Sequence, residues 1–280
     1  MQSSGVFTRG KKMCDKKSAN FEIEGEHFQE NIECSTVVNP KTESIKPSVE
    51  KRKTIVLTKM GNDHVFSNMN NQDYSCYIPN IKLVVDGCGS GKHSEVGAQL
   101  FTQLFSGEVK QCIDTEKEVS INTLDDIVCS VFKRMLLVWD NIHFLTENYC
   151  FTILICFETE DEFIVANCGD GFIVTEDIQG NISFDKLDDG EYPMYYIYNF
   201  IDGKHLKEYK DGAYFTFTHF SKKEYANVGV ASDGLRFFDR LLDVDKRNFL
   251  DFLHNGKKGQ IEKLINRNKI KFHDDISIVF

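Results

Sequence analysis

The chain has 280 residues, of which 41% are hydrophobic and 27% charged, a composition that can fill a sizeable core and excludes disorder throughout. The longest apolar stretch with strand-like character, residues 149–157, is far shorter than the roughly 20 residues that cross a bilayer. The 33 basic and 43 acidic side chains give a net charge of −10, which argues against nucleic acid or an anionic membrane as partner and suits metal cations. Residues 1–20 lack the apolar centre of a secretory signal, so we expect a cytoplasmic protein.

The first 53 residues lack sustained periodicity and end in a basic cluster at residues 51–53. We interpret residues 1–53 as a flexible or loosely attached leader. Two short patches in it, residues 21–23 and 35–38, have the composition of strands and could add to the body that follows.

Short β-rich runs separated by turn residues follow the leader, and they predict antiparallel strands. These runs are residues 54–58, 74–78, 81–85, 149–157, 162–167, 172–175, 182–184, 213–219, 229–232 and 276–280. Apolar residues at helical spacing predict helices over residues 94–105 and 124–144, and later segments at 237–254 and 261–266 are expected to cover another sheet face. We therefore predict one layered α+β domain over residues 54–280.

Several aspartates stand beside glycine where a predicted strand ends, and others stand where a strand begins. They are Asp86-Gly87, Gly169-Asp170-Gly171 and Asp233-Gly234 after strands, and Asp73 and Asp274-Asp275 before strands. If the sheets bring these ends together, the carboxylates form a dense negative site that needs divalent cations such as Mg²⁺ or Mn²⁺. Asp-Gly is also a common turn signal, and spacing alone does not show that the strand ends converge.

Five motifs resemble, in order, the series found in the metal-dependent type 2C protein serine/threonine phosphatases. They are Asn71-Gln72-Asp73, Val85-Asp86-Gly87-Cys88-Gly89, Ala166-Asn167-Cys168-Gly169-Asp170-Gly171, Ala231-Ser232-Asp233-Gly234-Leu235 and Asp274-Asp275-Ile276-Ser277. Each motif is weak alone, but the ordered series spans about the whole body. The stretch Gly61-Asn62-Asp63-His64 makes the chain most similar to the bacterial branch of that family.

The resemblance implies two antiparallel β-sheets packed as a sandwich flanked by helices, with a binuclear Mn²⁺ or Mg²⁺ centre at one end. Asp86 would bridge the two ions and the Gly87 carbonyl would bind one of them, while Asp233 and Asp274 would complete the other. Asp86 and Asp233 are thus the expected catalytic residues.

The same resemblance implies that Asp73 acts mostly through a metal-bound water, and that Asp170 with Asp233 forms a weaker third metal site. The role of Asp275 stays open. Two cations about 3.5–4 Å apart would activate a water that attacks phosphorus in line, so that phosphoserine and phosphothreonine are hydrolysed without a covalent intermediate. The implied partners are a phosphoprotein substrate and a cognate serine/threonine kinase, and we expect a monomer.

Three positions depart from the family pattern. Cys88 stands where many relatives have a histidine, Gln72 replaces a common acidic residue, and Asn68 replaces the arginine that grips substrate phosphate. Other basic residues would have to bind substrate, although such side chains often only cover a surface; the candidates are His64, Lys92, His93 and Arg236.

These departures motivate an alternative, a pseudophosphatase that binds phosphoproteins without catalysis. Retention of the aspartates favours the enzyme, because an unused cluster of carboxylates is costly to keep.

The glycine-rich segment 87–92 also invites comparison with nucleotide-binding loops. The phosphate-binding pattern needs glycine where Asp86 stands and serine or threonine where His93 stands. The dinucleotide pattern fails as well, because its third glycine falls on Lys92. We therefore exclude nucleotide binding.

Overall fold

The computed structural model describes residues 8–9, 53–117, 119–138, 141–187, 193–201 and 212–280. Most of the predicted leader, including the patches at 21–23 and 35–38, lies outside the described residues. Residues 8–9 form a strand that the sequence did not predict, β1 (Thr8–Arg9), which pairs with the edge of the first sheet.

The strands of the described residues form two antiparallel sheets. The first has the order β1, β9 (Thr216–Ser221), β6 (Glu162–Cys168), β5 (Phe151–Glu158), β4 (Ile81–Gly87), β3 (Asp73–Ile78). The second has the order β2 (Val56–Lys59), β11 (Ile276–Val279), β10 (Tyr225–Ala231), β7 (Gly171–Asp177), β8 (Ile182–Leu187). All ten predicted strands are present as β2 to β11, with ends that differ by a few residues.

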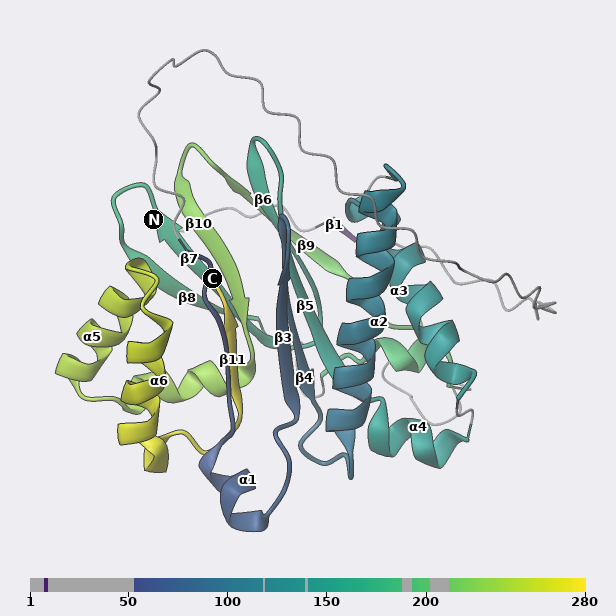
Figure 1. Cartoon of the computed structure of the whole chain (residues 1–280), viewed down its shortest axis with the longest axis horizontal. Coiled ribbons are helices and arrows are strands. Elements are labelled where there is room, and N and C mark those ends of the chain that lie inside the picture. The colour runs from purple at the N-terminus through teal and green to yellow at the C-terminus, as the bar shows by residue number, and fades with distance from the viewer. Residues whose placement is uncertain (1–7, 10–52, 118, 139–140, 188–192, 202–211) are drawn as a thin grey trace, which may run out of the picture. The chain divides into compact units, whose positions relative to one another are not determined.

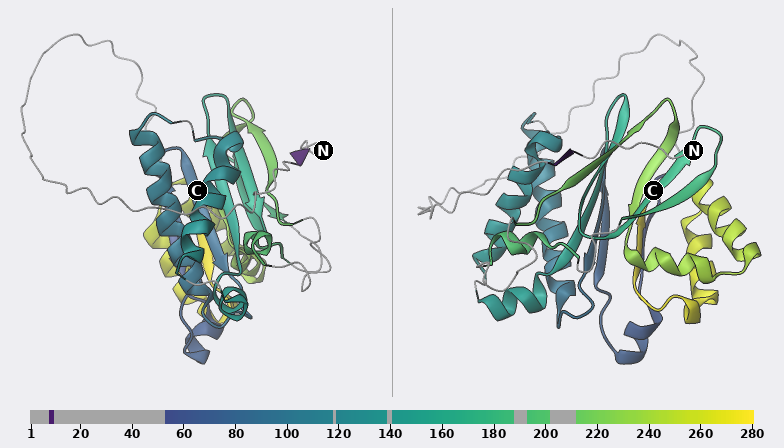
Figure 2. Two further views of the ribbon diagram at one scale, coloured as in Figure 1. Left: turned by 90° about the vertical axis from the view of Figure 1, so that its right-hand side faces the viewer. Right: turned by 180° about the vertical axis from the view of Figure 1, so that it is seen from behind.

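Helices cover the outer face of each sheet (Figure 1), and Figure 2 shows the same arrangement from the side and from behind. Against the first sheet lie α2 (Ser94–Asp114), α3 (Ile121–Leu136) and α4 (Ile142–Asn148), and against the second lie α5 (Asp243–His254) and α6 (Lys258–Arg267). Shorter elements are α1 (Asn62–Ser67) and the 3-10 helices η1 (Tyr196–Asn199), η3 (Asp233–Arg240) and η4 (Lys269–Lys271). None of the helices in the described ranges combines the length and hydrophobicity that crossing a bilayer takes.

Three apolar layers hold these elements together. Alternate residues of each strand point to opposite faces, so Leu83 and Val85 pack against α2 and α3, whereas Val84 packs between the sheets. Val230 of β10 and Val279 of β11 meet Val84 in that middle layer. The predicted fold, two antiparallel sheets packed as a sandwich flanked by helices, is confirmed.

The predicted helix over 124–144 is wrong in one respect, because the structure has two helices there. The side chain of Asn141 accepts a hydrogen bond of 2.9 Å from the amide of His143 and caps α4. A capping residue has an extended backbone, here with φ −71 and ψ 125, which interrupts a continuous helix. The predicted helix over 237–254 is likewise divided, into η3 and α5, by the extended backbone of Leu241 and Leu242.

Phe132 on α3 lies in the apolar core between the first sheet and its helices, and its replacement tests how much this packing stabilises the fold. Its ring is fully buried and lies 5.2–5.7 Å from the rings of Phe101, Phe151, Tyr196 and Phe200. We expect Phe132→Ala to lower the free energy of unfolding by about 3–5 kcal/mol, because it removes buried apolar surface and leaves a cavity. Urea denaturation measures the loss, and Phe66→Ala serves as control because that side chain is 81% exposed. Equal stability of the two variants would contradict this packing.

Candidate metal centre

Two aspartates lie side by side on neighbouring strands of the first sheet, at the end of the sheet that carries α1 in Figure 1. Asp73, the first residue of β3, pairs in register with Asp86 near the end of β4. Asp86 lies two residues after Val84 on β4, so its side chain points to the same face, the one between the sheets. Asp73 shares that face because it is directly paired with Asp86. Asp73 is only 2% exposed and Asp86 is partly exposed, so the first sheet fixes two neighbouring carboxylates at the end of its strands.

The second sheet brings further aspartates to the same end. Ala231 pairs with Ile278, which places Asp233, just after β10, beside Asp274, just before β11. The Ser232 amide donates to the Ser277 carbonyl at 2.9 Å, and the Ser277 amide donates to Ser232 Oγ at 2.8 Å. These bonds fix the start of η3 against the start of β11.

Gly234 is required because the backbone of Asp275 packs directly against it. A Cβ atom on Gly234 would lie 1.8 Å from the carbonyl oxygen of Asp275, a distance that no side chain tolerates. The pair Asp233-Gly234 is therefore more than a turn signal, because glycine lets the loop that carries Asp233 pack directly on the loop that carries Asp274 and Asp275.

The charges of these groups reach one another. Burial raises the pKa of Asp73 to about 7, and the negative charge of Asp275 adds to the shift. Burial, followed by the charges of Asp73 and Asp233, raises the pKa of Asp86 well above its ordinary value. The structure thus brings Asp73 and Asp275, which are 202 residues apart in sequence, close enough for their charges to interact.

Asp233 belongs to the same cluster. Burial raises its pKa to about 6; Arg236 opposes this shift, whereas the negative charges of Asp274 and Asp170 add to it. Each of the five aspartates that the sequence suggests as metal ligands therefore interacts electrostatically with at least one other. We call Asp73, Asp86, Asp170, Asp233 and Asp274 the carboxylate cluster.

Asp275 has a structural role that the sequence left open. Its carboxylate accepts hydrogen bonds from the amides of Gly61 at 2.7 Å and Gln72 at 2.5 Å. Nδ1 of His64 lies 2.9 Å from Asp275 Oδ2, and the hydrogen bond to this carboxylate raises the pKa of His64. His64, a candidate for substrate binding, is buried and engaged with Asp275 rather than turned toward solvent.

Arg236 is the basic candidate that contacts the carboxylate cluster. Its guanidinium pairs with Asp233 and with Asp274, at 2.9 Å from Nη2 to Asp274 Oδ2. The sequence placed Arg236 near the site but gave no sign of this pairing. Lys92 and His93 are exposed in the segment between β4 and α2, and Nδ1 of His93 lies 3.4 Å from Glu95 Oε1.

The three departures from the family pattern have local explanations. Asn68 ends α1 in the left-handed conformation with φ 56, which asparagine tolerates better than most residues. Gln72 is buried, and its backbone amide donates a hydrogen bond to the carboxylate of Asp275. Cys88 Sγ lies 3.0 Å from Ser90 Oγ, and the Cys88 thiol is close enough to the buried Tyr195 to contribute to the raised pKa of that phenol.

The cluster fits divalent cations by its donor chemistry. Both carboxylate oxygens of Asp73 are buried, and neither has a well-aligned hydrogen-bond partner among the described residues. Hard cations such as Mg²⁺ and Mn²⁺ prefer carboxylate and carbonyl oxygens. As the side chains stand, however, no three His, Cys, Asp or Glu residues of the described chain form a group that could hold a metal ion. Metal binding therefore requires some of them to move.

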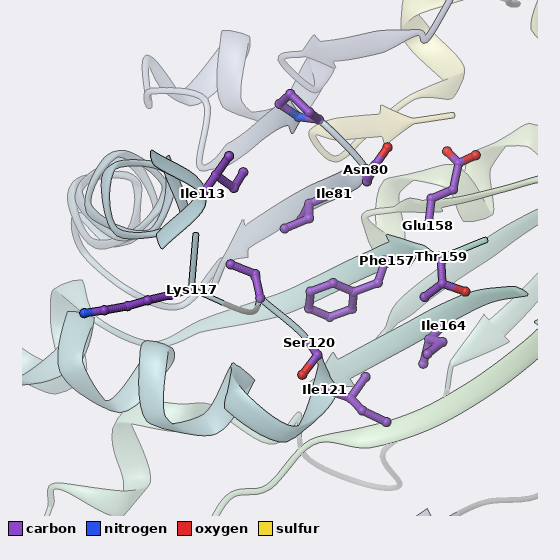
Figure 3. A pocket seen from close by; sticks show the side chains of 12 residues that line it. Asn80, Ile81, Ile113, Lys117, Ser120, Ile121, Phe157, Glu158, Thr159 and Ile164 are labelled. Carbon is purple, nitrogen blue, oxygen red and sulfur yellow. The ribbon is translucent and has the colours of Figure 1, made fainter. Parts of the chain in front are cut away.

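An apolar cavity of about 330 Å³ lies elsewhere, between the β3–β4 turn and the segment that joins α2 to α3 (Figure 3). Ile81, Ile113, Ile121 and Phe157 line it. Ile81 begins β4 and Asp86 lies near its other end, so this cavity is remote from the carboxylate cluster and has no part in its chemistry.

Comparisons with known proteins agree with this geometry. The family model Protein phosphatase 2C matches residues 60–258, and no curated protein matches the chain. The chain is similar to the Mycobacterium tuberculosis serine/threonine phosphatase PstP/Ppp, with 16% identity, a TM-score of 0.53 and coverage of 81% of this chain and 96% of that one.

Two further solved structures share the fold. The catalytic domain of PstP in complex with two manganese ions has 16% identity, a TM-score of 0.53 and the same coverage of 81% and 96%. MsPP from Mycobacterium smegmatis, in complex with cacodylate, has 12% identity, a TM-score of 0.50 and coverage of 81% and 96%. Identities this low establish only the common fold. Because the family model matches most of the chain, this protein belongs to the protein phosphatase 2C family, and its body is a serine/threonine phosphatase domain.

Proposed function

We propose that this chain is an active, metal-dependent phosphatase that hydrolyses phosphoserine and phosphothreonine in proteins. The observation that carries the proposal is the Asp73–Asp86 pair, whose Asp73 oxygens are buried without well-aligned partners among the described residues. A buried carboxylate of this kind is costly unless a cation joins it. The residues proposed to hold two Mn²⁺ or Mg²⁺ ions are Asp73, Asp86, Gly87, Asp233 and Asp274, with Asp170 and Asp233 serving a weaker third site.

When bound, two such cations acidify water and neutralise the phosphoryl oxygens. The chain's own contribution is to hold the donors rigidly. Asp86 is fixed by pairing on both sides, with Asp73 and with Thr152, and Asp233 is fixed by the Ser232–Ser277 hydrogen bonds. A phosphate dianion would be repelled by the carboxylates alone, so substrate binding depends on the cations as well.

The identity of the partners stays a prediction from the sequence. We propose a phosphoprotein substrate, a cognate serine/threonine kinase, a cytoplasmic location and a monomeric state. The PstP structure that contains two manganese ions supports the choice of metal.

One observation favours the alternative, a pseudophosphatase that binds phosphoproteins without catalysis. Arg236 already pairs with Asp233 and Asp274, and a permanent ion pair there would leave the site without two of its ligands. The enzyme remains the better proposal because Arg236 does not pair with Asp73 or Asp86 in the described structure, so the inner carboxylates still require a cation.

Metal dependence of hydrolysis separates the two functions. We expect the full chain to hydrolyse p-nitrophenyl phosphate and a phosphothreonine peptide with Mn²⁺, and EDTA to abolish this activity. Asp233→Asn should lower turnover about a hundredfold or more, since even groups that only position metal ligands contribute about 10–100-fold. Asp251→Asn on α5 is the matched control, because Asp251 is exposed and its partners among the described residues, Asn255 and Lys257, are nearby on the surface.

Inertness of the wild-type chain with both Mn²⁺ and Mg²⁺ would favour the pseudophosphatase. Unchanged turnover in Asp233→Asn would show that the ligand assignment is wrong.

The stability of the metal-free protein should depend on pH through Asp73. Its pKa is raised from 3.8 to about 7 in the folded state, so the folded chain keeps a proton that the unfolded chain has lost above about pH 4. The stabilisation is complete below that pH and is lost as the pH rises through 7. We expect EDTA-treated protein to lose about 2–4 kcal/mol of unfolding free energy between pH 5 and 8.

Asp73→Asn isolates this contribution, which matters because Asp86, Asp233 and His64 also have raised pKa values and change stability in the same direction. Urea denaturation of the variant should show a smaller loss between the two pH values. Saturating Mn²⁺ should restore stability to the wild type at pH 8. A variant with the wild-type pH dependence would rule out protonation of Asp73 as the cause.

A further inference from the structure

Arg236 bridges two carboxylates that come from different parts of the chain. Arg236 and Asp233 lie three residues apart on η3, whereas Asp274 precedes β11. Nη1 pairs with Asp233 Oδ2 and Nη2 pairs with Asp274 Oδ2. A planar guanidinium can serve two acceptors at once with separate N–H groups, which a lysine ammonium matches less well.

A ring supports the guanidinium in this position. Cζ of Arg236 lies 4.9 Å from the centroid of the Phe237 ring, and Phe237 itself is buried. A cation over an aromatic face is stabilised by the ring's charge distribution. The Arg236 side chain is nevertheless 47% exposed, so it can leave the carboxylates without disturbing the core.

The bridge separates two pairs of aspartates within the carboxylate cluster, which we call its outer and inner halves and which do not include Asp170. The outer half, Asp233 and Asp274, is 21% and 36% exposed and has the Arg236 charge beside it. The inner half, Asp73 and Asp86, is paired strand to strand, and the interactions that the described structure gives for Arg236 do not extend to it. A guanidinium and a metal ion cannot both use the same oxygens of Asp233 and Asp274.

We propose that Arg236 is a built-in competitor of the divalent metal: it holds Asp233 and Asp274 in the metal-free protein and must withdraw before a cation binds them. The inference rests on the proposed metal-dependent function. It accounts for the finding that no three potential ligands in the described chain form a metal-holding group as they stand, because the ion pairs direct two of them toward Arg236.

Arg236→Ala removes the competitor, and the full chain is titrated with Mn²⁺ by isothermal calorimetry after EDTA treatment and dialysis. We expect the Kd for Mn²⁺ to fall about three- to tenfold, the equivalent of the two partly exposed ion pairs that Arg236 forms. The metal-free variant should also melt at a lower temperature than the metal-free wild type. The difference in melting temperature should shrink at saturating Mn²⁺, because the metal then replaces the guanidinium.

Arg240→Ala is the matched control. Arg240 lies on η3 and its Cζ is 4.6 Å from the centroid of the same Phe237 ring, so its removal also deletes one positive charge and one ring contact. Arg240 forms no ion pair with Asp233 or Asp274 within the described structure. Its loss should leave the Kd for Mn²⁺ within about twofold of the wild type, as expected for a surface charge largely screened by salt.

Three outcomes would overturn the inference. The first is a Kd in Arg236→Ala that is unchanged or higher, and the second is an equal fall in both variants, which would indicate a general effect of charge. In either case Mn²⁺ binding and hydrolysis by the wild type would leave the proposed function standing. The third is a failure of both the wild type and Arg236→Ala to bind Mn²⁺, which would overturn the proposed function as well.

Discussion

The geometry of the site depends on the hydrogen bonds of Asp275, which join the two sheets at the end where the carboxylates meet. Its carboxylate belongs to the segment before β11 in the second sheet, yet it accepts from the amide of Gln72, just before β3 in the first. The bond from Gly61 ties the start of α1 to the same group. Hydroxyl groups of Thr58, Ser75 and Ser277 extend this link between the sheets at 2.7 and 2.8 Å. These hydrogen bonds therefore hold the start of β3, where Asp73 lies, against the segment that leads into β11.

Two buried ionisable groups of the first sheet, Lys82 on β4 and Asp73 on β3, differ in how fully the protein satisfies them. Lys82 is 3% exposed, and its Nζ donates to Asn227 Oδ1 at 2.6 Å and to the Val228 carbonyl, while burial lowers its pKa. The protein itself satisfies this cation, so Lys82 is part of the core. At the other end of the sheet, Asp73 is equally buried but lacks well-aligned partners in the described chain. The fold satisfies Lys82 with two hydrogen bonds and gives Asp73 no comparably aligned partners among the described residues, which favours a ligand at Asp73.

The sequence predicted the features that are encoded locally. Strands from 54 onward follow from β-rich runs and turn residues, and the position of each aspartate follows from the strand it begins or ends. The break between α3 and α4 was missed because Asn141 caps α4 within a segment whose apolar spacing continues through it. Pairing between Arg236 and Asp274, and contact between Cys88 and Tyr195, join residues far apart in the chain. No local pattern encodes such contacts, because they arise only when the two sheets and their loops pack.

Arg236 also explains why the two functions considered for this chain are difficult to separate by residue type alone. The aspartates proposed as metal ligands are all present, which favours catalysis, and two of them pair with an arginine of the chain, which favours a binding module. The balance is decided by burial: a cation that reaches Asp73 and Asp86 gains the desolvated inner pair, which the exposed guanidinium does not neutralise. A divalent metal would therefore supply Asp73 and Asp86 with a positive charge that Arg236 does not supply, and this difference supports the proposal of an active enzyme.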